Sequence, residues 1–142
     1  MFDYPTEQRS QRRGFLADLH DDEVASIVAY TQARRYAIGD VAVRAGEVDR
    51  SLFVVTAGRF DVVGRGRVEA SLIRGDIFGE LAFFDGLPRS ADVVAATASE
   101  ALVMTPAGLD RLRLNEPRLA FLFLMDLGRL LSLRVRSAQR GG

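Results

Sequence analysis

The sequence has 142 residues, of which 48% are hydrophobic, and its 19 basic and 19 acidic side chains give a formal net charge of zero. This length and hydrophobic content suit one folded domain, and the charge balance gives no overall attraction to nucleic acid. The chain has no Cys and one His, His20, so it lacks the ligands for a disulfide framework, an iron–sulfur cluster or a metal enzyme with clustered His ligands. Without a Gly-x-Ser-x-Gly nucleophile elbow either, we predict that it is not an enzyme.

Residues 1–14 are predicted to form a polar lead-in to a domain that covers residues 15–142. The basic residues of this lead-in are not followed by the apolar run of a secretory signal. The longest apolar run, residues 119–125, is far shorter than the ~20 residues that a membrane-spanning helix needs. We therefore expect a soluble, cytoplasmic chain, which includes the case of a cytoplasmic domain attached to a membrane protein.

A helix is predicted over residues 18–30, where apolar residues recur at helical spacing after an acidic first turn. Residues 33–105 then alternate short apolar runs with Gly turns, which is typical of antiparallel strands. Pro106 and Pro117 each suit the first turn of a helix, so two helices are expected within residues 106–139. The pattern predicts a mainly β fold: an antiparallel sandwich or barrel of about eight short strands, with one N-terminal and two C-terminal helices.

The segment from Gly75 to Val94 is the part of the sequence most indicative of function. Gly79 allows a sharp turn before a short helix whose first backbone N–H groups have no intrahelical acceptor. The chain reversal that follows returns Arg89 to the start of this helix, where its planar guanidinium suits a phosphate. Beside them, Glu80 is suited to accept a hydrogen bond from a ligand hydroxyl. These features predict a pocket for a small phosphate ester, although an ion pair between Glu80 and Arg89 that merely closes a loop is an equally good reading of those two residues.

Two short motifs in this segment, Phe78-Gly-Glu-Leu-Ala and Pro88-Arg-Ser-Ala, resemble the phosphate-binding cassette of the cyclic nucleotide-binding domain family. The resemblance extends to Gly39-Asp40 and to residues 52–58, and it covers the chain from about Phe15 to Arg136. It implies a sensor domain that binds a cyclic nucleotide, cAMP in the first place, with no metal or other cofactor. It also implies that the strands form a double-stranded β-helix, or jelly-roll, and that a C-terminal helix moves over the base when the ligand binds.

The resemblance assigns a role to each residue of the pocket. Arg89 resembles the Arg that pairs with the cyclic phosphate, and Glu80 the Glu that binds the ribose 2′-hydroxyl. Val62 and Leu72 fall where the family presents apolar side chains to the sugar and base, although ordinary barrel core is an equally good reading of both. The residues implied to bind the ligand are Gly79, Glu80, Leu81, Ala82, Arg89, Ser90, Ala91, Val62, Leu72 and Arg134.

The sequence departs from the family pattern in the last helix, where Leu133 and Arg134 replace the hydroxyl side chains that read adenine in the catabolite activators. We expect Leu130, Leu131 or Leu133 to cap the base by packing, or Arg134 to stack on it. Ser90 is compatible with cAMP and also with a guanine in the syn form, so cGMP stays open. Asp92 stands where Thr or Ser is commonest, and strand alternation predicts that it points away from the pocket.

The next question is what the domain regulates when it binds its ligand. Because the chain ends at Gly142, soon after the last helix, we expect no direct DNA binding by this chain. We expect instead the regulatory part of a larger protein, such as a channel or transporter. The apolar residues 119–125 cover every face of their helix, which favours a protein partner or self-association. The alternatives are a ligand-free interaction or oligomerisation domain, a jelly-roll enzyme, and a sensor of another small anion.

Overall fold

The computed structural model describes residues 14–140 of the chain. The predicted lead-in, residues 1–14, therefore lies outside the described residues except for Gly14. The strands are β1 (Gln32–Tyr36), β2 (Val41–Val43), β3 (Leu52–Ala57), β4 (Arg59–Gly64), β5 (Arg67–Ile73), β6 (Ile77–Phe78), β7 (Asp92–Ala95) and β8 (Ser99–Met104). The helices are α1 (Asp21–Val28), α2 (Glu80–Asp85), α3 (Pro106–Asn115) and α4 (Pro117–Arg140).

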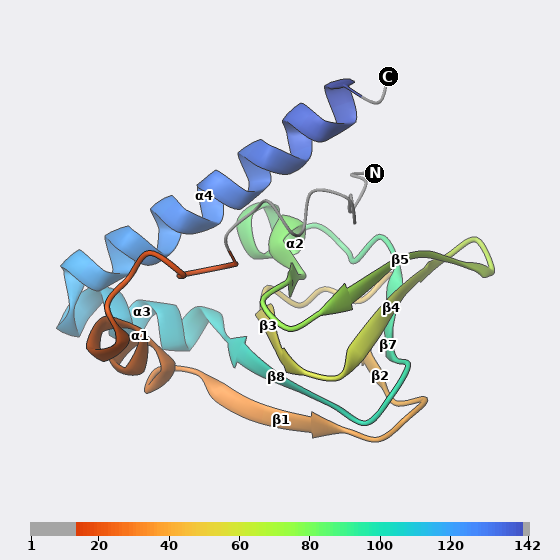
Figure 1. The fold of residues 1–142 in the computed structure, drawn as a ribbon, viewed down its shortest axis with the longest axis horizontal. Helices are drawn as coiled ribbons and strands as arrows, with labels where there is room; N and C mark the ends of the chain where they lie inside the picture. Colours follow the sequence, from red (N-terminus) through yellow and green to blue (C-terminus); the bar gives the residue numbers. More distant parts are fainter. Residues whose placement is uncertain (1–13, 141–142) are drawn as a thin grey trace.

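The strands form two four-stranded antiparallel sheets that face each other. Sheet A has the order β1-β8-β3-β6, and sheet B has the order β2-β7-β4-β5. In Figure 1 the strands occupy one side of the molecule, while α1, α3 and the start of α4 gather on the other side and α4 runs past α2. The predicted mainly β jelly-roll with eight antiparallel strands and flanking helices is thereby confirmed.

Sheet A separates two hydrophobic clusters. Alternation along β3 sends Phe53 and Val55 into the space between the sheets, where Phe53 stacks on Phe78 with ring centroids 4.6 Å apart. Leu52, on the opposite face of the same strand, packs under the helices and is completely buried. Because both faces of this strand are covered, its sequence is a continuous apolar run instead of an apolar–polar alternation.

The helical layer is joined to the sheets by specific polar contacts as well as by apolar packing. The first helix begins at Asp21, three residues later than expected, because residues before it form turns and the Leu16 N–H donates to Asp126 of α4 at 2.6 Å. Arg118 of α4 pairs with Glu23 of α1 at 2.6 Å. The Glu23 pKa is lowered by the hydrogen bond from the His20 N–H and by Arg118.

The C-terminal helices begin where the two prolines lie. Pro106 is the first residue of α3, and the Thr105 hydroxyl caps this helix by accepting a hydrogen bond from the Gly108 N–H at 3.0 Å. Pro117 begins α4, which buries one apolar face against the second cluster. None of the helices within residues 14–140 is both long enough and apolar enough to cross a bilayer.

Candidate functional site

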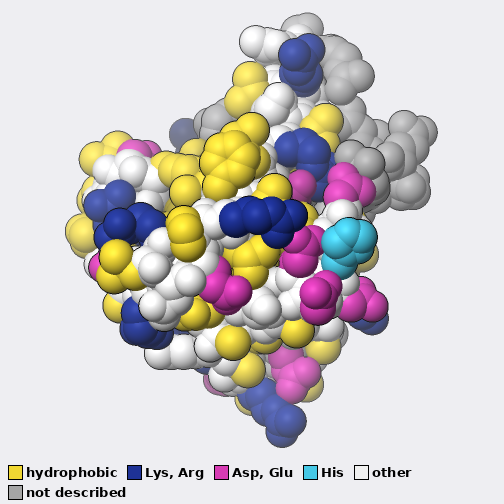
Figure 2. Space-filling view, turned by 90° about the vertical axis from the view of Figure 1, so that its left-hand side faces the viewer, with side chains coloured by type: hydrophobic (Ala, Val, Ile, Leu, Met, Phe, Trp, Pro, Cys, Tyr) yellow, Lys and Arg dark blue, Asp and Glu magenta, His cyan; other side chains and the backbone are white. Residues whose placement is uncertain are grey.

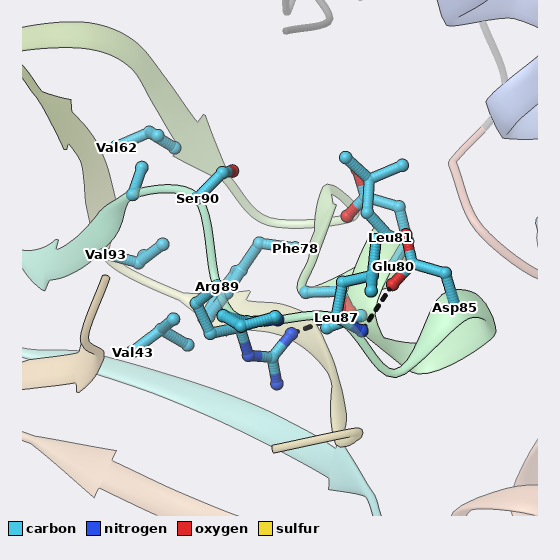
Figure 3. Close-up of a pocket in the computed structure, with 14 residues that line it drawn as sticks. Val43, Val62, Phe78, Glu80, Leu81, Asp85, Leu87, Arg89, Ser90 and Val93 are labelled. Atoms are coloured by element: carbon cyan, nitrogen blue, oxygen red, sulfur yellow. Dashed lines mark hydrogen bonds between the residues drawn. The ribbon is translucent and has the colours of Figure 1, made fainter. Parts of the chain in front are cut away.

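The segment from β6 to β7 forms one wall of a cavity of about 260 Å³. Figure 3 shows Val43, Val62 and Val93, from three strands of sheet B, on one side of this cavity and the α2 residues Glu80 and Leu81 on the other. The residues that line it are Val43, Val62, Phe78, Gly79, Glu80, Leu81, Ala82, Asp85, Leu87, Pro88, Arg89, Ser90, Ala91 and Val93. Its wall is therefore apolar toward the sheet and polar toward the α2 segment.

Gly79 is required at the start of α2 for two independent reasons. Its φ of +83° lies in the left-handed region, which L side chains rarely adopt. A Cβ at this position would also lie 2.7 Å from Arg89 Nη1 and 2.9 Å from the Ser51 carbonyl oxygen. The absence of a side chain is what allows the Arg89 guanidinium to lie directly against the backbone.

Arg89 is almost fully buried and is fixed by oxygen atoms from two neighbouring segments. Its Nη1 donates to the Gly79 carbonyl and its Nη2 to the Ser51 carbonyl, both at 2.8 Å. Its backbone is also held, because the Arg89 N–H donates to the Glu47 carbonyl at 2.8 Å. The buried Nε has no hydrogen-bond partner within residues 14–140. One donor of this rigidly placed cation is thus not used by the described part of the chain.

Asp49 gives Arg89 a nearby carboxylate, with 3.6 Å between Asp49 Oδ2 and Arg89 Nη2. Partial burial alone would raise the Asp49 pKa, but the hydrogen bond from the Ser51 N–H and the charge of Arg89 outweigh burial and lower the pKa below 3.8. The carboxylate therefore stays ionised at neutral pH.

Glu80 forms a buried ion pair with Arg134 of α4, in which Arg134 Nη1 donates to Glu80 Oε1. Only 2% of each side chain is exposed. Arg134 also donates through Nη2 to the Ile77 carbonyl at 3.0 Å. The ion pair proposed from sequence between Glu80 and Arg89 is not what the structure shows: Glu80 pairs with Arg134, and Arg89 pairs with Asp49.

Most of the residues predicted from sequence to bind a ligand do lie around this cavity, and two do not. Those that line it are Val62, Gly79, Glu80, Leu81, Ala82, Arg89, Ser90 and Ala91. Leu72 is completely buried opposite Phe60 in the core between the sheets, so it belongs to the barrel core and does not line the cavity. Arg134 lines a different recess, and its guanidinium is engaged by Glu80, which differs from the expected stacking on a base.

The structure adds lining residues that sequence reasoning did not single out. Val43 and Val93 lie on strands of sheet B, and Asp85 and Leu87 lie around the turn after α2. The apolar alternation of β2 and β7 could have indicated the two valines but would not have separated them from core residues. Asp92 accepts a hydrogen bond from the Ala45 N–H at 2.7 Å and does not line the cavity, in line with the predicted strand alternation.

Comparison with known proteins gives a consistent family. The family model for the cyclic nucleotide-binding domain matches residues 33–116. Glutaminase 2 of Bradyrhizobium diazoefficiens is 34% identical over 127 residues, which are 89% of this chain and 20% of that protein. The cAMP-dependent protein kinase regulatory subunit of Eremothecium gossypii is 31% identical over 111 residues, which are 72% of this chain and 24% of that protein. The chain thus spans only a fifth to a quarter of the length of these curated relatives.

Solved structures match the fold over most of the chain. The crystal structure of a cyclic nucleotide-binding domain from Methylobacillus flagellatus superposes with a TM-score of 0.78 and 28% sequence identity. The match covers 84% of this chain and 70% of that structure. Domains of this family are regulatory sensors that bind cyclic nucleotides as ligands. Within residues 14–140, no cluster of His, Cys, Asp or Glu side chains is arranged to hold a metal ion.

Replacing Gly79 by Ala is expected to lower the free energy of unfolding by about 3 kcal/mol, the sum of left-handed strain and overpacking against Arg89. Gly86 is a matched control at the other end of α2. Its φ is +68°, but an added Cβ there would meet the flexible Arg50 side chain at an ordinary 3.4 Å. Gly86→Ala should therefore cost only about 1 kcal/mol of backbone strain. Urea unfolding measures both, and equal losses would contradict the proposed packing constraint at Gly79.

Proposed function

Because the chain belongs to the cyclic nucleotide-binding domain family, we propose that the cavity beside α2 binds a 3′,5′-cyclic nucleotide, with cAMP as the ligand. The single observation that carries this proposal is the Arg89 arrangement: a buried guanidinium fixed by backbone carbonyls, with its Nε unpartnered within the described residues. A phosphate placed here meets a preorganised cation, and preorganisation lowers the cost of binding. The first N–H groups of α2, which have no intrahelical acceptor, supply further donors.

The other parts of the ligand find suitable partners around the same cavity. Glu80 lines the cavity as a buried carboxylate, which suits the ribose 2′-hydroxyl as a hydrogen-bond acceptor. The valines of sheet B offer apolar contact to the sugar and base. Ser90 lines the cavity and can donate to a phosphate oxygen or to a syn guanine. Curated relatives are named for cAMP and for cGMP alike, so the choice of cAMP rests on the family resemblance of the pocket residues and is tested below.

We further propose that the domain is a non-enzymatic sensor in the cytoplasm, where cyclic nucleotides are made, and that it regulates a larger protein. This role is supported by the small share of its relatives' length that the chain covers. A channel or transporter is the kind of output that we favour, and no direct DNA binding is expected of this chain. A ligand-free assembly domain is disfavoured because Glu80 and Arg89 are both present and both line the cavity.

The signal is proposed to pass from the cavity to α4 through the ion pair between Glu80 and Arg134. Glu80 lies on the cavity wall and Arg134 lies within α4, so movement of α2 on binding pulls on α4 directly. Phe83, next to the cavity wall in α2, also contacts Phe123 of α4 with ring centroids 6.5 Å apart. These two contacts join the α2 segment to α4, the helix that the family resemblance implies moves over the base.

Part of α4 is also proposed to associate with a second copy of the chain. Phe121 and Met125 expose 62% and 58% of their surface and lie four residues apart on one face of the helix. Gly128, three residues further on, faces open space, which allows another helix to approach closely. Figure 2 shows hydrophobic side chains gathered over the helical side of the molecule. Exposed apolar patches of this kind are typical of interaction sites.

Calorimetric titration is expected to show cAMP binding to the native chain and no measurable binding to Arg89→Leu. Arg89→Lys, which keeps the charge but loses the planar fork, should bind more weakly by about tenfold or more, a loss within the ~1.5–3 kcal/mol of a charge-assisted hydrogen bond. A parallel titration with cGMP identifies the preferred base. Circular dichroism must show that each variant is folded. Absence of binding of both nucleotides to folded, ligand-free native protein would overturn the proposal.

Arg134→Met is expected to uncouple α4 from the cavity. The chain contains no Cys, so spin labels on Arg65→Cys and Gln139→Cys report one distance without interference. Saturating cAMP should shift this distance in the otherwise native chain and leave it nearly unchanged in Arg134→Met, while the neighbouring exposed control Arg136→Met keeps the shift. Because Arg134→Met leaves Glu80 buried without this cation, it should also cost about 3–5 kcal/mol of stability. An equal cAMP-induced shift in both variants would contradict the coupling.

Sedimentation equilibrium is expected to show a dimer of the native chain at tens of micromolar and a monomer of Phe121→Glu. The reason is that a charge buried at the helix–helix contact opposes association. The control Ile38→Glu, at a residue that is 74% exposed on the barrel, should leave the dimer intact. A native chain that stays monomeric at millimolar concentration would rule out self-association through α4.

A further inference from the structure

A second cavity, of about 270 Å³, lies over the outer face of sheet A and shares no lining residue with the cavity beside α2. Its floor is formed by outward-facing side chains of β3 and β8, and its walls by α1, by residues next to Gly14 and by Phe123 of α4. We name it the sheet A recess. Its lining residues are Phe15, Leu16, Val24, Ile27, Val28, Thr31, Val54, Val55, Thr56, Arg74, Gly75, Leu102, Met104 and Phe123.

The lining of the sheet A recess is mostly apolar: its polar side chains are Thr31, Thr56 and Arg74, and the Thr31 hydroxyl is occupied by donating to the Val28 carbonyl at 2.7 Å. Val28, Val54 and Leu102 are half-buried side chains that face the recess without being covered. At one edge, Arg74 is exposed, and its guanidinium has no hydrogen-bond or ion-pair partner within residues 14–140. The Thr56 hydroxyl lies on the same lining. An apolar recess with one unpaired cation at its edge is complementary to an apolar molecule that ends in an anion.

Nearby acidic groups do not cancel the charge of Arg74. Asp76, two residues along the chain, is buried and accepts a hydrogen bond from the Ile73 N–H at 2.9 Å. Asp126 accepts from the Leu16 N–H and pairs with Arg129 at 2.8 Å. Neither carboxylate lines the recess or forms an ion pair with Arg74, and Arg74 is the one charged residue among the described residues that line it.

We propose that the sheet A recess binds a straight-chain carboxylate of about six to ten carbons, with its alkyl chain over sheet A and its carboxylate on Arg74. Engineered apolar cavities of ~150 Å³ take up benzene, and pockets for larger ligands begin near 300 Å³, so the recess suits a ligand between these sizes. A helix or a folded partner is too wide for a space of this volume. The proposal is independent of cyclic nucleotide binding, because the two cavities have separate linings.

Titration calorimetry of the full chain with hexanoate, octanoate and decanoate tests the apolar part of this proposal. Affinity should rise by about fourfold for each added methylene until the recess is filled, after which it should level off. Val28→Trp fills the recess and should abolish octanoate binding while leaving cAMP binding unchanged, which shows that the variant is folded. If octanoate binds Val28→Trp as well as the native chain, or does not bind the native chain saturably, the proposal is wrong.

The charge of Arg74 is tested by comparing octanoate with octanol. Arg74→Gln should weaken octanoate by about tenfold and leave octanol unchanged. Arg67→Gln, an exposed substitution at the start of β5, the strand that ends just before Arg74, should change neither. Equal effects of Arg74→Gln on both ligands would show that the guanidinium does not select the anion. A native chain that binds octanoate but not cAMP would contradict the proposed function alone. A native chain that binds cAMP but not octanoate would contradict this proposal alone.

Discussion

The buried ion pair between Glu80 and Arg134 is the contact on which the working arrangement of this domain depends. Two charged side chains that are each 2% exposed are tolerated in an interior only when each neutralises the other. The pair therefore fixes α4 relative to α2 more strictly than apolar packing alone, which allows helices to slide. Arg134 also donates to the Ile77 carbonyl, so the same guanidinium joins α4 to the strand that enters the cavity wall.

Sheet A divides the molecule into two functional faces. On its inner side the barrel core carries the cavity wall through Phe78, and on its outer side the helices pack over Leu52, Ile77 and Met104. β6 contributes to both clusters within two residues, Ile77 and Phe78, so this short strand connects the cavity wall directly to the helical layer. The sheet A recess lies on the helical side of this divide, against Phe123 of α4.

The sequence was sufficient for the fold and for the local chemistry of the α2 segment, because both depend on short-range patterns. Gly turns, strand alternation and prolines at helix starts are local signals, and Gly79 to Arg89 lie close together in the chain. The pairing of Glu80 with Arg134 spans 54 residues, and no local pattern reports that distance. Leu72 shows a different limit: the family resemblance implied the same ligand contact for Leu72 as for Val62, and only the pairing with Phe60 places Leu72 in the core, away from the cavity.

The effect that the proposed ligand would have on α4 depends on how many hydrogen bonds the Glu80 carboxylate can accept. A carboxylate offers about four lone-pair sites, so a hydrogen bond from Arg134 to Oε1 does not prevent a ribose hydroxyl from donating to the same group. Ligand and ion pair are then compatible, and each favours the same position of Glu80. Coupling between sites is reciprocal, so a ligand that holds Glu80 in this position also holds α4 close to α2. Under the proposed function, the helix movement that the family resemblance implies is a tightening of a contact that already exists in this chain.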